Sequence, residues 1–391
     1  MADIKAIKGN HCLRYCNTTT YIYLTATITT LVLLNVFSLS SHLTTIRDIG
    51  RKMNHAMDQL YNLKRTAYDG EETSGKTITK IVTTTSGIAM SQTSRYTTET
   101  SRAITTKAYP KERQLNCTAC FQHNFTFVLN NKNMCKPTEE SSSIELIVLI
   151  SSVHSNSEKR KALRETWLTP TDQNKSKFRY AFLLGMNPNN KLQVALETES
   201  ATYNDIVQED FTDTYQNLTL KTIMAMKWAS SFCQNAKFVM KTDDDMFVHL
   251  PALHKILLKH EKKLQYSIGG QCRINEGPIR SKGYKWYVPK ELYPQSKYPG
   301  FCSGTGYVTS MSVAKQIYKV SQHVPFFYLE DVYIGLCVNR LGMGVTNLPG
   351  FHAVKVPIGC NYKNGVVITS HQLDPKLLRN VWSLKCNATI F

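Results

Sequence analysis

The stretch from Lys237 to His249 constrains this chain more than any other, because three consecutive aspartates interrupt an apolar run. The residues Phe238–Met240 predict a buried strand, since the run is too short for a helix, and Asp243–Asp245 follow it. In open α/β sheets, ligands bind at the carboxyl ends of strands. Three adjacent carboxylates there are costly unless a positive group offsets them, which a divalent cation with oxygen ligands does. An acidic turn in solvent is the alternative, and motifs further along the chain favour the cation.

The segment before this triplet alternates strand and helix patterns. A fully apolar run at its start and the short runs that follow predict buried strands, and apolar residues at helical spacing separate them. Such alternation predicts an α/β fold with a parallel sheet and right-handed connections. The predicted strands are Ile144–Ile150, Phe178–Leu184, Tyr203–Val207 and Phe238–Met240, and the predicted helices begin at Ser157 and cover Leu192–Ser200 and a segment that ends near Phe232.

The first predicted helix carries two arginines on one face. Arg160 and Arg164 are four residues apart, while Leu163 and Trp167 share another face that would pack on the sheet. A pair of guanidinium groups suits a diphosphate or a carboxylate. Two surface arginines without a ligand fit the spacing equally well.

An aromatic, proline-rich region follows the acidic triplet. Its aromatic residues could line a groove for a sugar ring, or they could fill the core beneath a long loop. Gly304 and Gly306 come next, and glycine permits close approach of the backbone to a ligand. The aromatic residues are Tyr284, Trp286, Tyr287, Tyr293, Tyr298 and Phe301.

Two further segments carry residues suited to catalysis. The stripe from Leu329 to Gly342 predicts a helix with Glu330 and Asp331 in its first turn, where the helix dipole favours an ionised carboxylate. A carboxylate fixed in that way suits a general base, although acidic first turns are common. His371 follows a predicted strand at Val366–Thr369 and could be a metal ligand or a structural histidine. Pro375–Trp382 predicts a final helix.

The first third of the chain predicts a membrane anchor and a stem. Residues 15–46 contain no charged side chain, and Tyr21–Ser40 as a helix would span about 30 Å, one bilayer core. No convincing signal-peptidase site follows, so we expect a cytoplasmic tail at 1–20, a signal anchor at 21–40 and a disordered Ser/Thr-rich stem at 41–143. Glycosylation sequons place the remainder in the lumen, and they lie at Asn116, Asn124, Asn174, Asn217 and Asn387.

Cysteines and charge narrow the functional class further. Two of the eleven cysteines precede the anchor, and the other nine are an odd number, so at least one thiol is free or pairs with another chain. Cys117 and Cys120 are expected to form a structural disulfide rather than a metal site. The formal charge of +18 is spread along the chain, and no zinc-finger or RNA-binding signature accompanies it. We therefore expect no nucleic-acid partner.

Several of these motifs occur together and in order, and in that combination they resemble the β-1,3-galactosyltransferase family. The resemblance runs from about Ile144 to Trp382. The stretches around Gly277, Lys285 and Leu292 look closest to members that galactosylate terminal GlcNAc. The motifs that carry it are Arg160–Trp167, Asp205–Lys221, Lys241–Asp245, Phe301–Tyr307 and Glu330–Gly335.

The resemblance implies a GT-A-type nucleotide-sugar-binding fold with a mostly parallel sheet over 144–391. It implies a UDP-galactose donor, a manganese ion, inversion at the anomeric carbon and a GlcNAc-terminated glycan acceptor at the Golgi membrane. By position, Asp331 matches the base, with Glu330 beside it as the fallback. The metal ligands would be Asp243, Asp245 and His371; the donor-binding residues Arg160, Arg164, Asp243 and Asp244; and the acceptor-binding residues Trp286, Tyr287, Gly304 and Gly306.

Three other functions compete with this one. A β-1,3-N-acetylglucosaminyltransferase of the same superfamily is the nearest, and trials with both UDP-sugars separate the two. A catalytically inactive, lectin-like Golgi protein is the second, but it would have no need of Asp245, Asp331 and His371 together. A secreted metal-dependent hydrolase would require more histidines at fixed spacing than the sequence offers.

Overall fold

The computed structural model describes residues 117–139 and 141–386, which belong to one compact unit. An eight-stranded sheet forms its centre, in the order β1-β4-β3-β2-β5-β8-β7-β9, and a two-stranded sheet pairs β10 with β6. The strands are β1 (Phe127–Leu129), β2 (Ile144–Ser151), β3 (Phe178–Met186), β4 (Ile206–Thr212), β5 (Ala236–Asp243), β6 (Phe247–Val248), β7 (Ser267–Arg273), β8 (Phe301–Ser310), β9 (Gly344–Asn347) and β10 (Thr369–Ser370).

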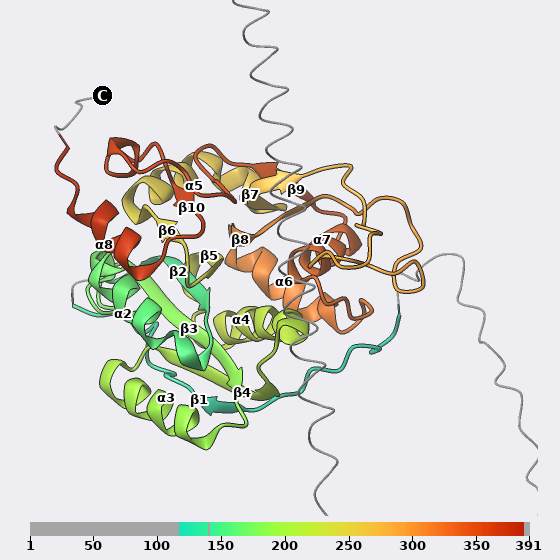
Figure 1. Ribbon diagram of the computed structural model, residues 1–391, viewed down its shortest axis with the longest axis horizontal. Coiled ribbons are helices and arrows are strands. Elements are labelled where there is room, and N and C mark those ends of the chain that lie inside the picture. The colour runs from blue at the N-terminus through green and yellow to red at the C-terminus, as the bar shows by residue number, and fades with distance from the viewer. Residues whose placement is uncertain (1–116, 140, 387–391) are drawn as a thin grey trace, which may run out of the picture. The chain divides into compact units, whose positions relative to one another are not determined.

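One half of the sheet confirms the strand–helix alternation predicted from the sequence. Strands β4, β3, β2 and β5 run parallel, with Leu146 opposite both Phe178 and Phe238. Figure 1 shows α2 and α3 on one side of β2 and β3, and α4 on the other. The helices are α2 (Ser157–Glu165), α3 (Asn190–Tyr203), α4 (Leu218–Phe232), α5 (Leu250–Leu264), α6 (Met311–Ser321), α7 (Glu330–Arg340) and α8 (Pro375–Ser383).

The other half of the sheet makes the whole sheet mixed. Strand β8 runs antiparallel to both β5 and β7, and β1 runs antiparallel to β4. In the eight-stranded sheet, four strand pairings are parallel and three are antiparallel. The predicted mostly parallel sheet is therefore confirmed only by a narrow margin. The cause is the long loop between β7 and β8, because β8 returns without a crossover helix and so runs antiparallel to the strands on both sides.

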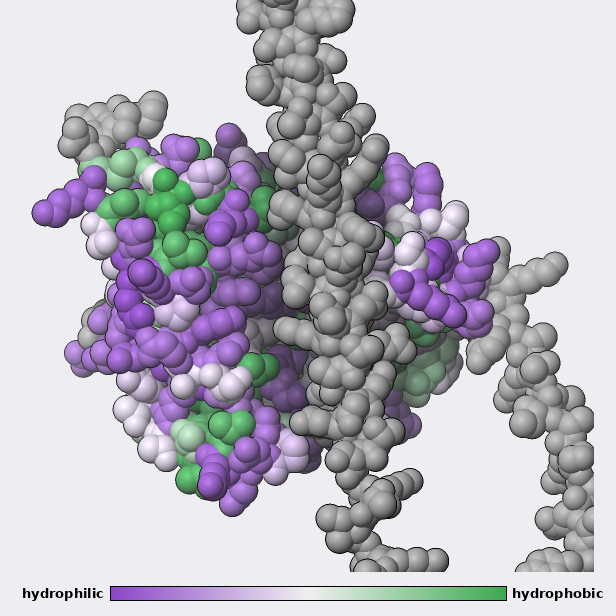
Figure 2. Space-filling model, in the orientation of Figure 1, coloured by the Kyte–Doolittle hydropathy of each residue, from purple (hydrophilic) through white to green (hydrophobic). Residues whose placement is uncertain are grey.

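Alternating side chains of the central strands supply two hydrophobic cores, one on each face of the sheet. In β2, Ile147 and Leu149 pack with α4, α6 and α7, while Val148 and Ile150 pack with α2, α5 and α8. Strands buried on both faces read as continuous apolar runs, which is why β2 was easily predicted. Hydrophilic residues cover most of the surface visible in Figure 2.

The folded part begins before residue 144, where the sequence predicted the end of the stem. Phe121 is buried, β1 pairs with β4, and a disulfide joins Cys135 to Cys233 at the end of α4. Residues 117–139 are therefore part of the domain, and the expected boundary was wrong. Phe125, Phe127 and Leu129 alternate as in a strand, a signal that the prediction did not use, and the pairing of β1 with β4 and the disulfide to Cys233 hold the segment to the domain.

The disulfide pairing agrees with the odd number of cysteines counted in the sequence after the predicted anchor. Four disulfides join Cys117 to Cys120, Cys135 to Cys233, Cys272 to Cys302, and Cys360 to Cys386. Within residues 117–139 and 141–386, Cys337 is the one free thiol, and it is buried.

We found no helix in the described part of the chain that is long and apolar enough to cross a membrane. The expected tail at 1–20 and the anchor at Tyr21–Ser40 both lie outside the described residues, as does the stem up to residue 116.

Loss of the Cys135–Cys233 disulfide is expected to destabilise the domain by about 2–5 kcal/mol, because it closes a 98-residue loop. Thermal unfolding of the Cys135→Ala, Cys233→Ala double variant measures this effect. The matched control removes Cys117 and Cys120, which are three residues apart, and should lower the melting temperature less. Equal losses for both pairs would contradict the loop-length argument.

Candidate active site

The acidic triplet lies where β5 leaves the sheet, as the sequence predicted. Asp243 ends β5, and Asp244 and Asp245 form the turn before β6. Strand β10 pairs with β6 and places Ser370 opposite Phe247. This pairing brings the residue after β10, His371, to the turn from more than 120 positions away in the chain.

Asp245 and His371 face one another at the surface of this turn. The distance from His371 Nε2 to Asp245 Oδ1 is 3.4 Å, and each side chain is about a quarter to a third exposed, at 24% and 30%. The Nδ1 of His371 lies 3.2 Å from the carbonyl oxygen of Ala353, which suits a donated hydrogen bond that orients the ring. The hydrogen bond to Asp245 raises the pKa of His371. Burial opposes ionisation of Asp245, yet the contact with His371 leaves the pKa of that carboxyl lowered.

Asp244 points inward, away from its two neighbours. Its carboxylate accepts hydrogen bonds from Ser152 Oγ at 2.8 Å, Asn156 Nδ2 at 2.9 Å and Lys159 Nζ at 3.1 Å. The residue is 5% exposed. Through these contacts, Asp244 fixes the turn to the segment that follows β2.

Lys241 connects the triplet to the helix that carries the expected base. Its Nζ lies 2.8 Å from Asp243 Oδ1, 2.8 Å from Glu330 Oε1 and 2.6 Å from the carbonyl oxygen of Gly304. Burial disfavours the ammonium, but the charges of Asp243 and Glu330 outweigh burial and raise the pKa of Lys241. No role was predicted for Lys241, although a lysine between the apolar strand and the aspartates was a usable signal.

Glu330 and Asp331 begin α7 and differ in accessibility. Glu330 is buried and accepts hydrogen bonds from Thr222 Oγ1 at 3.1 Å and Tyr307 OH at 3.2 Å, besides its ion pair with Lys241. Burial raises the pKa of Glu330 to about 7. All of its contacts are internal, which leaves it little access to a substrate.

Asp331 is partly exposed and is held by backbone groups. The N–H of Val332 donates to Oδ1 at 2.8 Å, and the N–H of Gly304 donates to Oδ2 at 3.3 Å. Burial of the carboxylate raises the pKa of Asp331, although both N–H donors work against this shift. An oriented carboxylate with raised basicity is what proton abstraction requires.

The two glycines expected at the acceptor lie against protein atoms. A Cβ on Gly304 would lie 2.3 Å from Glu330 Oε1, and a Cβ on Gly306 would lie 3.3 Å from Met240 Cε. Residue 304 is glycine because its backbone lies close to Glu330. The sequence predicted a close approach to a ligand, and the neighbour observed is a side chain of the protein.

The aromatic region divides into a buried and an exposed set. Tyr293, Tyr298 and Phe301 are buried; the two tyrosines pack on Phe327 and Phe301 packs on Tyr298, so these rings fill the core beneath the loop. Trp286 is 52% exposed. Tyr287 is half-buried, and its carbonyl accepts a hydrogen bond from the Tyr328 hydroxyl.

Tyr215 joins the exposed set and was missed by the sequence analysis. Lys285 lies over its ring at 4.8 Å. Burial raises the pKa of the Tyr215 hydroxyl, and the negative charge of Asp331 raises it further. Tyr215 lies in the connection between β4 and α4, and the charge of Asp331 acts on its hydroxyl.

Both arginines of α2 have carboxylate partners within the domain. Arg160 is fully buried and donates to Glu199 at 2.6 and 2.9 Å and to Ser152 Oγ at 2.9 Å. Arg164 forms a two-pronged ion pair with Asp205, at 2.8 and 2.9 Å. The contacts favour a structural task for the pair over the expected contact with a donor diphosphate.

Three sequons can be placed in the structure. Asn124 is exposed in the loop before β1. The side-chain amides of Asn174 and Asn217 donate to the carbonyl oxygens of Tyr180 and Thr212, at 3.0 and 2.9 Å. Asn116 and Asn387 lie outside the described residues.

Across residues 117–139 and 141–386, no three His, Cys, Asp or Glu side chains gather closely enough to hold a metal ion unaided. The chemistry of Asp243, Asp245 and His371 nevertheless fits a divalent cation. Each is partly exposed, the carboxylates of Asp243 and Asp245 each present an oxygen beyond the one in contact with Lys241 or His371, and Nε2 of His371 would bind a cation in place of its contact with Asp245. Cations at nucleotide sites commonly take one or two carboxylates and complete their shell with phosphate oxygens.

Comparison with known proteins finds galactosyltransferases. A family model described as "Galactosyltransferase" matches residues 158–349. "Beta-1,3-galactosyltransferase 1" of Mus musculus is 44% identical over 262 residues, which are 67% of this chain and 78% of that protein. "Beta-1,3-galactosyltransferase 5" of Gorilla gorilla gorilla is 39% identical over 244 residues, 61% of this chain and 80% of that protein.

Among solved structures, the galactosyltransferase LgtC in complex with donor and acceptor sugar analogs shares 12% identity with this chain. The match covers 62% of this chain and 98% of that one, and its TM-score of 0.32 is too low to bear on the argument. The sequence relatives carry the conclusion by their identity and coverage. The chain therefore belongs to the β-1,3-galactosyltransferase family.

Proposed function

We propose that this protein transfers galactose from UDP-galactose to the 3-hydroxyl of a terminal β-GlcNAc on a glycan, with inversion at the anomeric carbon. The observation that carries the proposal is the junction of β5, β8 and α7, where Lys241 contacts Asp243, Glu330 and Gly304. This junction holds the donor motif and the partly exposed Asp331 at one edge of a GT-A-type sheet.

The proposed reaction is a single displacement. Asp331 removes the proton of the acceptor 3-hydroxyl as that oxygen forms a bond to C1 of galactose. The bond from C1 to the diphosphate oxygen breaks on the opposite face, and UDP leaves with the electron pair. Asp331 suits the base because backbone N–H groups fix its two oxygens and burial raises its pKa. One base and no carboxylate nucleophile are what an inverting displacement needs.

Asp243, Asp245 and His371 would hold a divalent cation, which we propose to be manganese. Such a cation supplies positive charge that offsets the charge developing on the departing diphosphate. The chain contributes the orientation of the ligands: Lys241 fixes one oxygen of Asp243, and Ala353 fixes the ring of His371. Asp244 stabilises the turn from the interior of the protein. It would affect donor binding only by positioning Asp243 and Asp245.

Trp286 and Tyr287 would line the acceptor groove together with Tyr215. Trp286 is exposed beside the half-buried Tyr287, and the apolar face of a sugar ring stacks on aromatic rings. Gly304 would act at the acceptor through Asp331, to which its N–H donates.

We also propose that the chain is a single-pass type II protein of the Golgi membrane, with the anchor at 21–40 and the catalytic domain in the lumen. Four disulfides in the domain support an oxidising compartment. Asn124 is the sequon best placed to carry a glycan, because it is exposed, while the amides of Asn174 and Asn217 bond to the backbone.

The direct test incubates a fragment covering 103–391 with manganese, UDP-galactose or UDP-GlcNAc, and acceptors ending in β-GlcNAc or β-Gal. A fragment that starts at residue 141 is unsuitable, because it would lack β1 and Cys135. Galactose joined β1,3 to GlcNAc is the expected product. Transfer of GlcNAc to galactose would assign the sister activity, and UDP binding without transfer would favour the lectin-like alternative.

Asp245→Ala is expected to weaken manganese-dependent binding of UDP-galactose by about tenfold to a hundredfold, because it removes a carboxylate from the cation. Calorimetry with and without manganese measures the effect. Glu276→Ala, an exposed carboxylate on the loop after β7, serves as the control. If Asp245→Ala bound the donor as the wild type does, the assignment of the cation to this turn would be wrong.

Trp286→Ala is expected to raise the KM for the acceptor roughly three- to tenfold, since an aromatic contact contributes about 0.5–1.5 kcal/mol. The KM for the donor should stay unchanged. Tyr284→Ala is the matched control, because Tyr284 is similarly exposed two residues away. The same change in both variants would remove Trp286 from the proposed groove.

A further inference from the structure

We infer that Lys241 is a positioning residue for the transfer reaction, one that sets Asp331 relative to the donor motif. The inference rests on the proposed function, because it assumes that Asp331 is the base. Its basis is the set of contacts around one buried ammonium group.

The hydrogen-bonding capacity of Lys241 is fully used. An ammonium has three N–H donors, and Nζ has three acceptors within 2.8 Å, on β5, β8 and α7. The side chain is 0% exposed. A group held by three elements at once moves only if those elements separate, so Lys241 fixes their spacing at the edge of the sheet.

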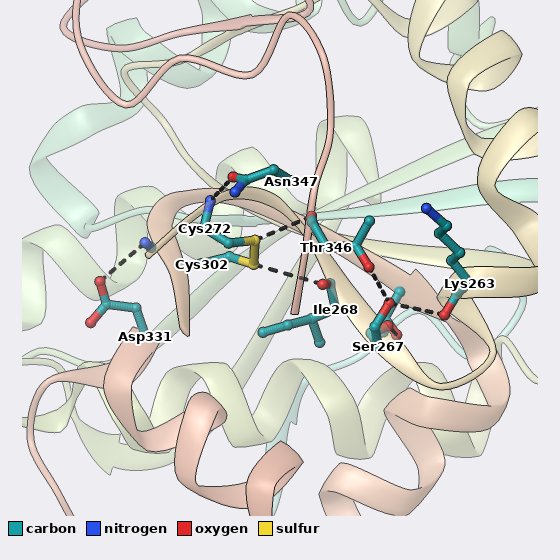
Figure 3. The surroundings of a disulfide bond; sticks show 10 residues. Lys263, Ser267, Ile268, Cys272, Cys302, Asp331, Thr346 and Asn347 are labelled. Atoms are coloured by element: carbon teal, nitrogen blue, oxygen red, sulfur yellow. Dashed lines mark hydrogen bonds between the residues drawn. A yellow bond between two sulfur atoms is a disulfide. The ribbon is translucent and has the colours of Figure 1, made fainter. Parts of the chain in front are cut away.

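Gly304 transmits this position to Asp331. Its carbonyl oxygen accepts from Lys241 at 2.6 Å, and its N–H donates to Asp331 Oδ2 at 3.3 Å, a bond drawn in Figure 3. Any shift of the Gly304 carbonyl therefore moves one of the two donors that orient the base. The Cys272–Cys302 disulfide, drawn beside this bond, ties β8 to β7 two residues before Gly304.

The tight fit of Gly304 against Glu330 reinforces this link. A Cβ on residue 304 would lie 2.3 Å from Glu330 Oε1, the same oxygen that accepts from Lys241. The ammonium, the carboxylate and the glycine backbone thus form one packed unit. Lys241 also holds Asp243, so the unit joins the donor motif to the base.

A purely structural task is the competing explanation, in which Lys241 only neutralises the buried Glu330. The two explanations predict different kinetics. Neutralisation alone affects the free energy of unfolding and leaves turnover of the folded enzyme unchanged. Positioning lowers kcat in a variant that still folds and still binds its substrates.

The test uses the full chain with Lys241→Met and Glu330→Gln combined, so that neither charge is left buried without its partner. We expect kcat to fall about a hundredfold, the effect of a misplacement of about 1 Å. The KM for the acceptor should change less than about threefold, and kcat is measured at saturating UDP-galactose and manganese, because loss of the contact between Lys241 and Asp243 also weakens donor binding. Turnover near the wild-type kcat would overturn the inference.

The matched control combines Lys227→Met with Glu209→Gln. This pair is also a lysine bridging a glutamate, at 2.6 Å, and a backbone carbonyl, that of Phe125, but it lies at the β1–β4 end of the sheet. Its loss should lower stability and leave kcat unchanged. An equal fall in kcat in the control variant would show a general response to pair removal and would overturn the inference.

If the Lys241 and Glu330 double variant fails to fold, Gly304→Ala tests the same link, because its Cβ displaces the glycine backbone from Glu330. A lower kcat with unchanged substrate binding is expected, and a wild-type kcat would overturn the inference. Failure of the proposed function is distinguishable, because the wild-type enzyme would then transfer no galactose in the parallel assay.

Discussion

The Asp331→Asn variant is expected to lose about a hundredfold to ten-thousandfold in kcat, the usual contribution of a general base. Asparagine has nearly the same shape, and its carbonyl oxygen can still accept a backbone N–H where Asp331 accepts those of Gly304 and Val332. It cannot take up a proton, so the acceptor hydroxyl would attack unassisted. Steady-state kinetics with UDP-galactose gives the loss. Calorimetry with UDP and manganese should show unchanged donor binding.

The pH profile of the wild type provides an independent check on this assignment. Asp331 acts as a base only when ionised, and burial raises its pKa above the ordinary range. Activity is therefore present above the raised pKa and falls as the pH drops through it, at a higher pH than for an exposed aspartate. The residual activity of Asp331→Asn should lack this acidic limb. A variant that kept most of its activity, or kept the limb, would place the base elsewhere.

Local patterns carried most of what the sequence predicted correctly. Strand β2 is buried on both faces, so its apolar run was unambiguous, and helix α7 showed its stripe and acidic first turn in one stretch. Asp243 and Asp331 were singled out as site candidates because each was predicted to lie at the end of an element, and the structure confirms those positions. The placement of His371 next to Asp245 depended on the resemblance to the family, since nothing local ties β10 to β6.

Long-range pairing accounts for most of what the sequence could not provide. Strand β8 enters the sheet between β5 and β7, and this insertion creates the junction at Lys241. Residues 117–139 appeared to be stem because their order comes from β4 and Cys233. A local pattern also cannot say whether a charged pair faces a ligand or another element.

Arg160→Met separates these two possibilities for the arginines of α2. We expect the variant to lose about 1–3 kcal/mol of stability, because Ser152 Oγ and the carbonyl of Val153 lose a buried donor, while Glu199 keeps its ion pair with Arg164. Arg160 is 0% exposed, and Glu199, Ser152 Oγ and the carbonyl of Val153 all accept from it. Denaturant unfolding measures this loss. In the folded fraction, UDP-galactose should bind about as well as in the wild type.

Arg379→Met is the matched control, since Arg379 also pairs with two carboxylates, Glu158 and Glu165, but on an exposed surface. Exposed ion pairs contribute little, so its unfolding should hardly change. If Arg160→Met were instead as stable as the wild type and bound UDP-galactose weakly, its guanidinium would act at the donor, as the sequence first suggested. The burial of Arg160 argues for the structural outcome, because a guanidinium already held by Glu199 and Ser152 would have to break those contacts to reach a diphosphate.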